Sequence, residues 1–410
     1  MDRREPVVII GGGPSGLAAA AAIAPHAPVL VLEREAQAGG IPRHCEHTGF
    51  GLRDLHRSMS GPAYARRLVM EAMNAGARIE TRTMVTGWAT LDTLEVTSPS
   101  GRREVTASAI VLATGARERA RAARRIPGDR PAGVYTTGQL QQAVHLHHQR
   151  IGKRAVVVGA EAVSWSAVLT LREAGCEVVA LTTEHPRAEA YAAMAMAGRL
   201  ALRVGVRTST RVVSVIGHGR VAGLEVEHVH TGAREVIECD TVVFTGDWIP
   251  DHELARSAGL VMDSGTLGPR TDGALRTSLP HVFAVGNLTH PVDTADVAAL
   301  DGRHVAHGVL AHLSGSPLPA AAPVPIGIDA PFRWIAPSLL RIGVAPPRGR
   351  LLLWSETHVR NPRVLVHQDG RVIARQRMPW PAAPGRVFRV PWTMLRDARE
   401  DAGPLTVGLG

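Results

Sequence analysis

The chain has 410 residues, 45% of them hydrophobic, which predicts two or three globular domains and excludes a disordered chain. Its formal net charge of +9 comes almost wholly from arginine, and no basic run alternates with aromatic residues, so a nucleic-acid partner is not expected. Its three cysteines, Cys45, Cys176 and Cys239, lie far apart in the sequence, which argues against a disulfide scaffold or a clustered metal site and fits a reducing compartment.

The first predicted unit opens on an apolar run, residues 7–10, which indicates a buried strand leading through a glycine-rich turn into an alanine-rich helix. Gly11 permits the tight turn, Gly13 lets a pyrophosphate reach the backbone, and Gly16 lets the helix lie close to the strand. Glu33 ends the next strand, about 20 residues on, where a carboxylate can accept hydrogen bonds from a ribose. The layout predicts a dinucleotide-binding unit; an ordinary glycine-rich turn is the plainer alternative.

The apolar stretch of this first helix, residues 17–24, is far shorter than the roughly 20 residues that a membrane span needs. The charged residues before the first strand lead almost at once into the glycine turn, a pattern that does not match an export signal. We therefore expect no transmembrane segment and a cytoplasmic location.

A second strand-turn-helix-strand pattern begins at Arg154 and ends near Glu184. Each copy is later closed by an apolar strand that ends in Thr-Gly, at Thr114–Gly115 for the first and Thr245–Gly246 for the second. The closing strand of the first copy precedes the second copy, and a further apolar strand ending at Gly286 follows it. The order predicts one nucleotide-binding domain inserted into another.

The spacing of apolar residues predicts the remaining helices and strands. Apolar spacing predicts helices over residues 61–76 and about 295–313, and a proline-rich connector follows at residues 314–325. Short alternating runs after it, with a hairpin signal at Gln368–Gly370, indicate a small β-rich domain. The predicted fold class is α/β, with two nested Rossmann-like dinucleotide-binding domains and a C-terminal β-rich domain. The predicted boundaries are 1–117 with 250–315 for the outer domain, 118–249 for the inserted domain and 326–410 for the C-terminal domain.

These patterns resemble the two-dinucleotide flavoproteins of the pyridine nucleotide-disulfide oxidoreductase family. Within it, the chain is most similar to the FAD-binding α subunits of amino-acid and opine-type dehydrogenases, including the D-hydroxyproline dehydrogenase group. The resemblance spans residues 1 to roughly 313. The motifs that carry it are Gly11–Gly16, Glu33, Gly39–Cys45, Ala113–Gly115, Thr245–Asp247 and Phe283–Asn287.

The resemblance implies that FAD is the cofactor. The first glycine turn would hold its pyrophosphate, Glu33 its adenosine ribose, and Gly286 with Asn287 its flavin phosphate and ribityl chain. Most relatives have aspartate where this chain has Asn287. The helix that starts near Asp296 would point its N-terminus at the flavin pyrimidine ring, where negative charge builds up on reduction. The residues implied to bind FAD are Gly11, Gly13, Pro14, Ser15, Gly16, Glu33, Arg34, Gly40, Val85, Thr114, Gly115, Gly286, Asn287 and Asp296.

The chain departs from the family in its cysteines. Disulfide reductases of this type carry paired redox cysteines, either just after the Gly-Gly turn or inside the inserted domain. At the former positions this chain has Pro42 and His47, and Cys45 has no partner nearby in the sequence. On this ground we predict that the chain is not a disulfide reductase.

The second departure is the inserted turn, which reads Gly-Ala-Glu-Ala-Val-Ser over residues 159–164. Glu161 places a carboxylate where a pyrophosphate would sit, and Ala162 and Ser164 place side chains where close approach is needed. Charge repulsion and lost backbone contacts would cost on the order of a few kcal/mol. The inserted domain is therefore predicted to keep its fold while binding NAD(P)H poorly or not at all.

The loop after Gly40 supplies the candidate catalytic residues, because the resemblance brings it toward the flavin. Arg43 could bind a substrate carboxylate with two hydrogen bonds, and His44 or His47 could accept a proton near neutral pH. A loop that only cradles FAD is an equally good interpretation. A zinc site is not predicted, because His44, Cys45 and His47 lack the spacing of separated ligand pairs.

The sequence thus predicts an FAD-dependent oxidoreductase, a dehydrogenase that oxidises a small amine, imino acid or hydroxy acid. Without NAD(P)H the flavin must pass its electrons to a partner subunit, a quinone or oxygen, and an intrinsic iron-sulfur cluster lacks the cysteine ligands it needs. Two alternatives stay open: an NAD(P)H-dependent flavin reductase, and a non-catalytic subunit in which FAD is structural. The role of the β-rich tail does not follow from its residues.

Overall fold

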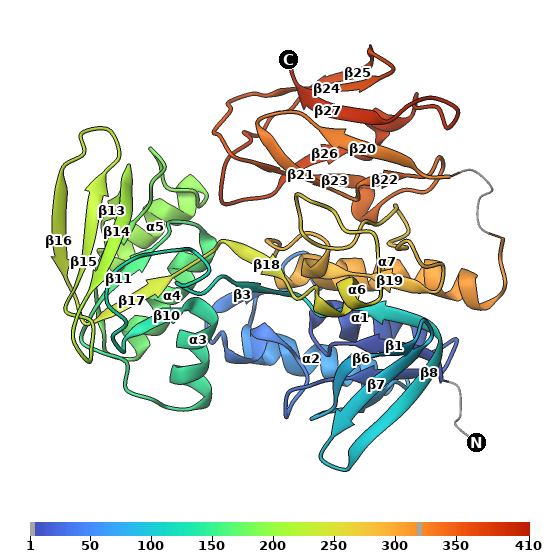
Figure 1. Ribbon diagram of the computed structural model, residues 1–410, viewed down its shortest axis with the longest axis horizontal. Helices are drawn as coiled ribbons and strands as arrows, with labels where there is room; N and C mark the ends of the chain where they lie inside the picture. The colour runs from blue at the N-terminus through green and yellow to red at the C-terminus, as the bar shows by residue number, and fades with distance from the viewer. Residues whose placement is uncertain (1–4, 318–321) are drawn as a thin grey trace. The chain divides into compact units, whose positions relative to one another are not determined.

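The computed structural model describes residues 5–317 and 322–410. The charged start of the chain, and residues 318–321 of the predicted connector, lie outside this description. The chain divides into two compact units, which are coloured along the sequence in Figure 1. The first unit contains residues up to 43, 49–116 and 250–410, and the second contains residues 44–48 and 117–249.

The first unit is built on a seven-stranded sheet in which long apolar strands are buried on both faces. Along the sheet the strands are β5 (Arg78–Glu80), β2 (Val29–Leu32), β1 (Glu5–Ile10), β8 (Gly101–Leu112), β7 (Thr93–Ser98) and β6 (Met84–Thr90), and β19 (Val282–Ala284) also pairs with β8. The second half of β8 runs parallel to β1 and β19, whereas its first half runs antiparallel to β7. The parallel part carries the first glycine turn at its carboxyl edge.

Three helices cover one face of this sheet: α1 (Pro14–Ile23), α2 (Gly61–Asn74) and α7 (Ala295–Leu313), while the short α6 (Glu253–Ser257) packs on the other face. Half of the residues of α1 are alanine, and these small side chains let α7 approach its backbone closely. A Cβ atom on Gly302 of α7 would lie 2.0 Å from the carbonyl oxygen of Ser15. The predicted helices at 61–76 and 295–313 agree with α2 and α7 to within two residues. Shorter elements are η1 (Ile41–His44), β3 (Thr48–Phe50), β4 (Met59–Ser60) and η3 (Gly286–Leu288).

The second unit repeats the arrangement on a parallel five-stranded sheet. Its order is β10 (Val134–Thr136), β17 (Thr241–Phe244), β11 (Arg154–Val158), β12 (Glu177–Thr182) and β13 (Val206–Arg207). Its helices are α3 (Thr137–Gln141), the π-helical turn η2 (Gln142–Leu146), α4 (Ala162–Glu173) and α5 (Ala192–Leu202). An antiparallel sheet of β14 (Thr210–Ile216), β15 (Gly223–His228) and β16 (Arg234–Glu238) follows. Where the chain enters and leaves this unit, β9 (Ala116–Glu118) pairs with β18 (Trp248–Pro250).

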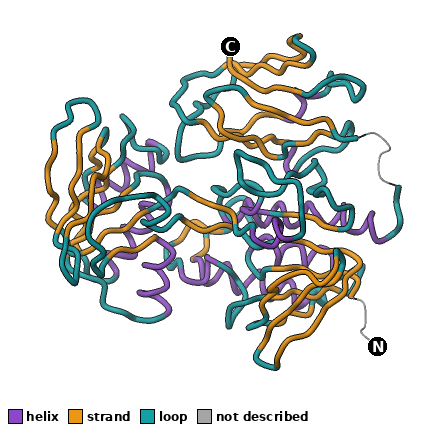
Figure 2. The backbone as a smooth tube through the Cα atoms, in the orientation of Figure 1, coloured by secondary structure: helices purple, strands orange, loops and turns teal. Residues whose placement is uncertain are grey.

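The C-terminal residues form two small sheets that pack face to face, as Figure 2 shows by its orange strands. One sheet has the order β22 (Leu339–Leu340), β20 (Val324–Ile328), β27 (Leu405–Leu409), β24 (Arg363–Gln368) and β25 (Arg371–Arg377). The other has β21 (Phe332–Ala336), β23 (Arg350–Ser355) and β26 (Phe388–Pro391), and the short helices are η4 (Pro347–Gly349) and η5 (Trp392–Leu395). The predicted fold class, two nested Rossmann-like units with a β-rich C-terminal part, is confirmed.

The C-terminal sheets belong to the first unit and attach to it through arginine-carboxylate pairs. Arg341 pairs with the buried Asp272 at 3.0 Å, and Arg348 pairs with the buried Asp301 at 3.2 Å. These contacts fix the tail on the segments around α7. The predicted domain boundary at residue 326 stays a prediction.

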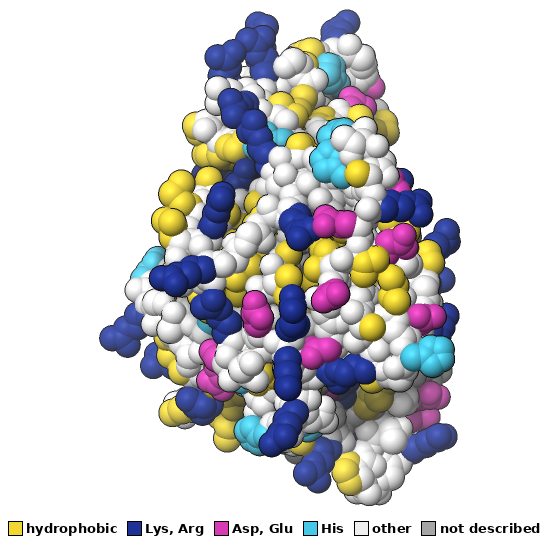
Figure 3. Space-filling model, turned by 90° about the vertical axis from the view of Figure 1, so that its left-hand side faces the viewer, with side chains coloured by type: hydrophobic (Ala, Val, Ile, Leu, Met, Phe, Trp, Pro, Cys, Tyr) yellow, Lys and Arg dark blue, Asp and Glu magenta, His cyan; other side chains and the backbone are white. Residues whose placement is uncertain are grey.

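Charge on the face drawn in Figure 3 is mixed: basic side chains are spread over it with acidic ones between them. Within residues 5–317 and 322–410, no helix is long and apolar enough to cross a membrane.

Candidate cofactor and active site

The glycine turn after β1 has no room for side chains at two positions. A Cβ atom on Gly11 would lie 2.5 Å from the carbonyl oxygen of Ala113, and one on Gly16 would lie 2.0 Å from the carbonyl oxygen of Gly11. Gly13 differs, because the nearest atom outside its own neighbourhood is Gly40 Cα, 4.0 Å from a Cβ placed there. The fold itself needs Gly11 and Gly16, whereas Gly13 leaves an open face where a diphosphate can reach the backbone.

The carboxylate of Glu33 is held against this turn. It accepts a hydrogen bond of 2.8 Å from the N–H of Gly12 and another of 2.8 Å from the N–H of Glu35. Glu33 is buried, and each of its oxygens keeps a further lone pair that a ribose hydroxyl can use. The neighbouring Arg34 is exposed and reaches Asp251 at 3.5 Å. The two predicted residues are thus both placed beside the turn by the end of β2.

The turn after β19 meets the first turn directly. A Cβ atom on Gly286 would lie 2.7 Å from the Ser15 hydroxyl oxygen, so these two predicted residues are in contact. Asn287 donates from its side-chain amide to the carbonyl oxygen of Asp293 at 2.9 Å and accepts from the N–H of Asp293 at 3.1 Å. Asn287 therefore closes the loop that leads into α7. Its bond to the Asp293 carbonyl oxygen needs an amide donor, which an aspartate lacks.

Asp296 stands in the first turn of α7 and is buried. Its carboxylate accepts hydrogen bonds from the N–H of Arg53 at 3.0 Å, from the Arg53 guanidinium at 3.3 Å and from the Thr294 hydroxyl. These partners hold a negative charge near the positive end of the helix dipole. Asp296 thus orders the start of α7.

The other predicted FAD residues line the same edge of the first sheet. The Thr114 hydroxyl donates to the carbonyl oxygen of Asp251 at 2.7 Å, and the Asp251 N–H donates to the carbonyl oxygen of Gly115 at 2.9 Å. Val85 is buried in β6. The open backbone at Gly13, the contact of Gly286 with Ser15 and the placed Glu33 carboxylate form a cradle that fits a dinucleotide.

The loop that was expected to carry catalysis is divided between the two units. Arg43 belongs to the first unit and donates to the carbonyl oxygen of Gln37. His44 and His47 belong to the second. There, the Cys45 thiol donates to Gln141 at 3.2 Å.

A chain of polar side chains continues from Gln141. Its amide donates to the Ser166 hydroxyl at 2.8 Å, and Ser166 in turn lies 2.7 Å from Nε2 of His47. The predicted His47 is therefore tied to α4 of the inserted unit. Sequence reasoning missed Gln141 and Ser166, because nothing in their local sequence marks them.

The turn of the inserted unit is filled by its own side chains. A Cβ atom on Gly159 would lie 2.0 Å from the Thr245 hydroxyl oxygen, and Ser164 hydrogen-bonds that hydroxyl at 2.7 Å. The Glu161 N–H at the start of α4 donates to Ser164 Oγ at 3.1 Å. The Glu161 carboxylate lies against Gly246, where a Cβ atom would be 1.5 Å from Oε1. The space above this turn is thus occupied by protein atoms.

Burial raises the pKa of Glu161 to about 8, with further contributions from the carboxylates of Glu189 and Glu118 and an opposing one from Arg124. At neutral pH the neutral acid is therefore favoured. The predicted charge repulsion toward a pyrophosphate is therefore weaker at neutral pH, while the carboxyl group itself lies beside Gly246 at this turn. Poor binding of NAD(P)H by the inserted unit stays a prediction.

The residues around Glu161 could not be found from sequence. Glu118 accepts hydrogen bonds from the Thr137 hydroxyl at 2.8 Å and from the N–H of Gly246 at 3.1 Å, and burial raises its pKa. Arg124 donates to the carbonyl oxygens of Thr245 and Gly246 at 3.0 and 2.5 Å. These groups come from separate segments, and only the tertiary fold joins them.

The three cysteines are buried, and none of them forms a disulfide within the described residues. Burial raises the pKa of Cys45 and of Cys176 to about 12 and that of Cys239 to about 11. Cys239 adds to the raised pKa of Cys176, so these two thiols lie within electrostatic reach of each other although they are far apart in sequence.

Known proteins share this sequence pattern and this fold. The profile of the pyridine nucleotide-disulphide oxidoreductase family matches residues 5–302. The chain belongs to this family. A thioredoxin reductase of Treponema pallidum (strain Nichols) is 26% identical over 330 residues, covering 76% of this chain and 98% of that protein.

Solved structures of family members share the fold. A thioredoxin reductase of T. acidophilum has a TM-score of 0.64 at 22% identity, over 77% of this chain and 99% of that one. A bacillithiol disulfide reductase of Bacillus cereus has a TM-score of 0.59 at 20% identity, over 75% and 99%. An L-proline dehydrogenase of P. horikoshii has a TM-score of 0.56 at 18% identity, over 76% and 56%.

The comparisons settle the coarse predictions. The chain is an FAD-dependent oxidoreductase of this family, and FAD is its cofactor. The prediction that it is not a disulfide reductase is contradicted, because relatives named thioredoxin reductase and bacillithiol disulfide reductase are similar to it. That prediction rested on cysteine spacing along the sequence, which tests only pairs that are close in the chain. The narrower likeness to amino-acid dehydrogenase subunits is not shown, although a proline dehydrogenase is among the structural neighbours.

Proposed function

We propose that this protein is a flavin-dependent dehydrogenase whose electrons come from a small amine, imino acid or hydroxy acid. They would leave to a partner subunit, a quinone or oxygen. The observation that carries the proposal is the position of Glu161, whose carboxyl group lies against Gly246 and fills the inserted turn. A proline dehydrogenase among the structural neighbours is in keeping with it.

Hydrogen bonding at the start of α4 also disfavours NAD(P)H. A pyrophosphate binds a helix N-terminus by accepting hydrogen bonds from free backbone N–H groups and by replacing water in an open turn. Here the Glu161 N–H already donates to Ser164 Oγ at 3.1 Å. An incoming NAD(P)H would have to displace both that bond and the carboxyl group, which weakens its binding.

In the first unit the residues fit FAD. The backbone around Gly13 would hold the diphosphate, Glu33 the adenosine ribose, and the loop closed by Asn287 the flavin phosphate and ribityl chain. When bound, FAD supplies a ring system that accepts a hydride equivalent from a substrate. The chain itself must orient the substrate and take up a proton, for which Arg43, His44 and His47 stay the candidates.

An anaerobic titration of the FAD-loaded protein with a panel of amines, imino acids and hydroxy acids tests the proposal. We expect the flavin absorbance to bleach with at least one donor class in the absence of NAD(P)H. Reduction by NADPH or NADH alone, with no response to any member of the panel, would overturn it.

A second candidate is an NAD(P)H-dependent reductase. The relatives named thioredoxin reductase favour it, and so does the complete parallel sheet of the second unit. In that case NAD(P)H would reduce the flavin and another molecule would reoxidise it. The titration separates the two candidates, because each predicts a different electron donor.

A further inference from the structure

The larger of the two C-terminal sheets ends in a strand edge that is unpaired among the described residues. β25 is the last strand of its five-stranded sheet and pairs with β24 on one side only among the described residues. An outer edge of this kind presents backbone N–H and C=O groups to solvent and can template the addition of another strand.

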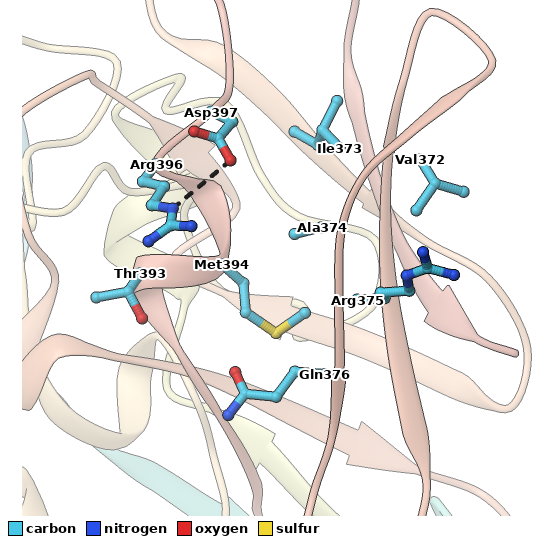
Figure 4. A pocket seen from close by; sticks show the side chains of 9 residues that line it. All are labelled: Val372, Ile373, Ala374, Arg375, Gln376, Thr393, Met394, Arg396 and Asp397. Carbon is cyan, nitrogen blue, oxygen red and sulfur yellow. Dashed lines mark ion pairs between the residues drawn. The ribbon is translucent and has the colours of Figure 1, made fainter.

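A groove runs beside this edge. It has a volume of about 480 Å³ and is lined by consecutive residues of β25 and by residues of η5 and the turn after it. In Figure 4, Ala374 and Gln376 point from the strand toward Met394 on η5, whereas Val372 and Arg375 point away from the gap. The register agrees, because Ala374 and Gln376 pair with the buried Val366 and Val364. The two layers of the sandwich are thus left open along β25.

The edge is basic. Arg371, Arg375 and Arg377 are exposed, and none of them has an ion pair or side-chain hydrogen bond within the described ranges. Arg396, across the groove, lies 3.6 Å from Asp397, the one acidic side chain in the lining. Many other arginines of this chain meet carboxylates. The uncompensated charge beside the groove is therefore a distinct feature of this edge.

A second copy of the chain is a poor occupant. Antiparallel pairing of two β25 strands about Ala374 would set Arg371 of each opposite Arg377 of the other, and like charges directly opposite each other destabilise a strand pair. The register shift at Ile373 further disturbs a regular pairing. A nucleic acid is also a poor fit, because the groove lining contains no aromatic side chain on which bases could stack.

We propose that β25 and the adjoining groove are a docking site for an extended acidic segment of a partner protein. The segment would add to β25 as a further strand, place carboxylates beside Arg375 and Arg377 on one face of the sheet, and lower a small apolar side chain toward Met394 on the other. Backbone hydrogen bonds supply the affinity and the arginines select the charge. The docking site does not depend on which donor reduces the flavin.

Fluorescence anisotropy with a labelled peptide of alternating glutamate and valine tests this on the full-length FAD-loaded protein. We expect saturable binding that weakens as salt rises. The same peptide with alternate backbone nitrogens methylated should bind at least about tenfold more weakly, because it keeps its charge but cannot pair as a strand. Equal binding of the methylated peptide would overturn the proposal, since it would reduce the contact to charge attraction alone.

The double variant Arg375→Glu with Arg377→Glu should lose at least about tenfold in affinity for the peptide. Arg333→Glu is the matched control, because Arg333 is exposed on the other sheet of the same domain. Flavin content and thermal unfolding of all variants should match the parent protein. Undiminished binding by the double variant, equal loss in the control, or tighter binding of a single-stranded oligonucleotide than of the acidic peptide would contradict the docking site.

Discussion

Glu161 shows how a residue's environment changes the meaning of its sequence position. In the sequence it predicts a negative charge facing a pyrophosphate. In the structure its pKa is about 8, so the group is mostly neutral at pH 7, and its carboxyl oxygen lies against Gly246. The charge state depends on Glu118, Glu189 and Arg124, whose proximity no local pattern encodes.

The raised pKa predicts a pH-dependent stability that Glu161→Gln removes. A carboxyl group with a pKa of about 8 in the folded protein and 4.5 as its ordinary value holds its proton more tightly when folded. Its contribution to the free energy of unfolding is therefore fully present below about pH 4.5 and is lost as the pH rises toward 8. Thermal unfolding between pH 5 and 8.5 should fall less steeply with pH for Glu161→Gln than for the parent. Parallel curves would show that the group is ionised throughout.

The first turn allows a matched test of two glycines. Gly16→Ala should destabilise the protein by about 2 kcal/mol or more, because the new Cβ would lie 2.0 Å from the Gly11 carbonyl oxygen. Gly13→Ala should leave unfolding of the FAD-free protein within about 0.5 kcal/mol of the parent while reducing FAD retention. Calorimetry measures the stability of each variant, and flavin absorbance after gel filtration measures its FAD retention. Full FAD retention by Gly13→Ala would show that the open backbone at Gly13 does not contact the cofactor.

At the scale of elements, sequence periodicity predicted the helices well, because α2 and α7 each bury one apolar face. It predicted less about the segment between β19 and α7, where order comes from side-chain bonds to backbone. Asn287 bonds both the N–H and the carbonyl of Asp293, and Asp293 pairs with Arg389 from the C-terminal sheets at 2.9 Å. Asn287, which the resemblance predicts only as a cofactor contact, also holds the loop together.

This loop predicts the effect of restoring the family's usual residue. Asn287→Asp cannot donate to the Asp293 carbonyl oxygen, and it places a second carboxylate near Asp293. We expect a loss of about 1–2 kcal/mol in unfolding free energy together with weaker FAD retention. Urea unfolding with and without FAD measures the loss in unfolding free energy. The control is Asn361→Asp, at a positive-φ position in the C-terminal sheets. An unchanged or stabilised Asn287→Asp would show that the two loop bonds contribute little.

At the scale of the whole molecule, the nested order of the two dinucleotide units was predictable from the repeated strand-turn-helix pattern and the order of its closing strands. The attachment of the C-terminal sheets was not, because alternating apolar runs specify strands but not the surface on which they pack. Asp301 illustrates this: it is buried, lies 2.5 Å from His290, and meets Arg348 from the tail.

Removing the partly buried Arg348 should therefore destabilise the protein more than removing an exposed arginine does. Arg348→Ala removes the arginine partner of the buried Asp301 carboxylate and leaves the hydrogen bond with His290, and we expect a loss of about 1–3 kcal/mol in unfolding free energy. Arg360→Ala, an exposed change in the same domain, should alter stability by less than about 0.5 kcal/mol. Equal unfolding free energies for the two variants would mean that the pair does not anchor the tail.

Anaerobic stopped-flow reduction of the FAD-loaded protein by NADPH and by NADH, with Glu161→Gly and Glu161→Gln in parallel, tests whether the Glu161 carboxyl group keeps nicotinamide nucleotides out of the inserted turn. If the carboxyl group blocks the inserted turn by occupying it, both nucleotides should bleach the parent flavin slowly or not at all. Glu161→Gly should then bind them at least about tenfold more tightly, and the isosteric Glu161→Gln should stay close to the parent. Rapid bleaching of the parent flavin at micromolar NADPH or NADH would contradict the account.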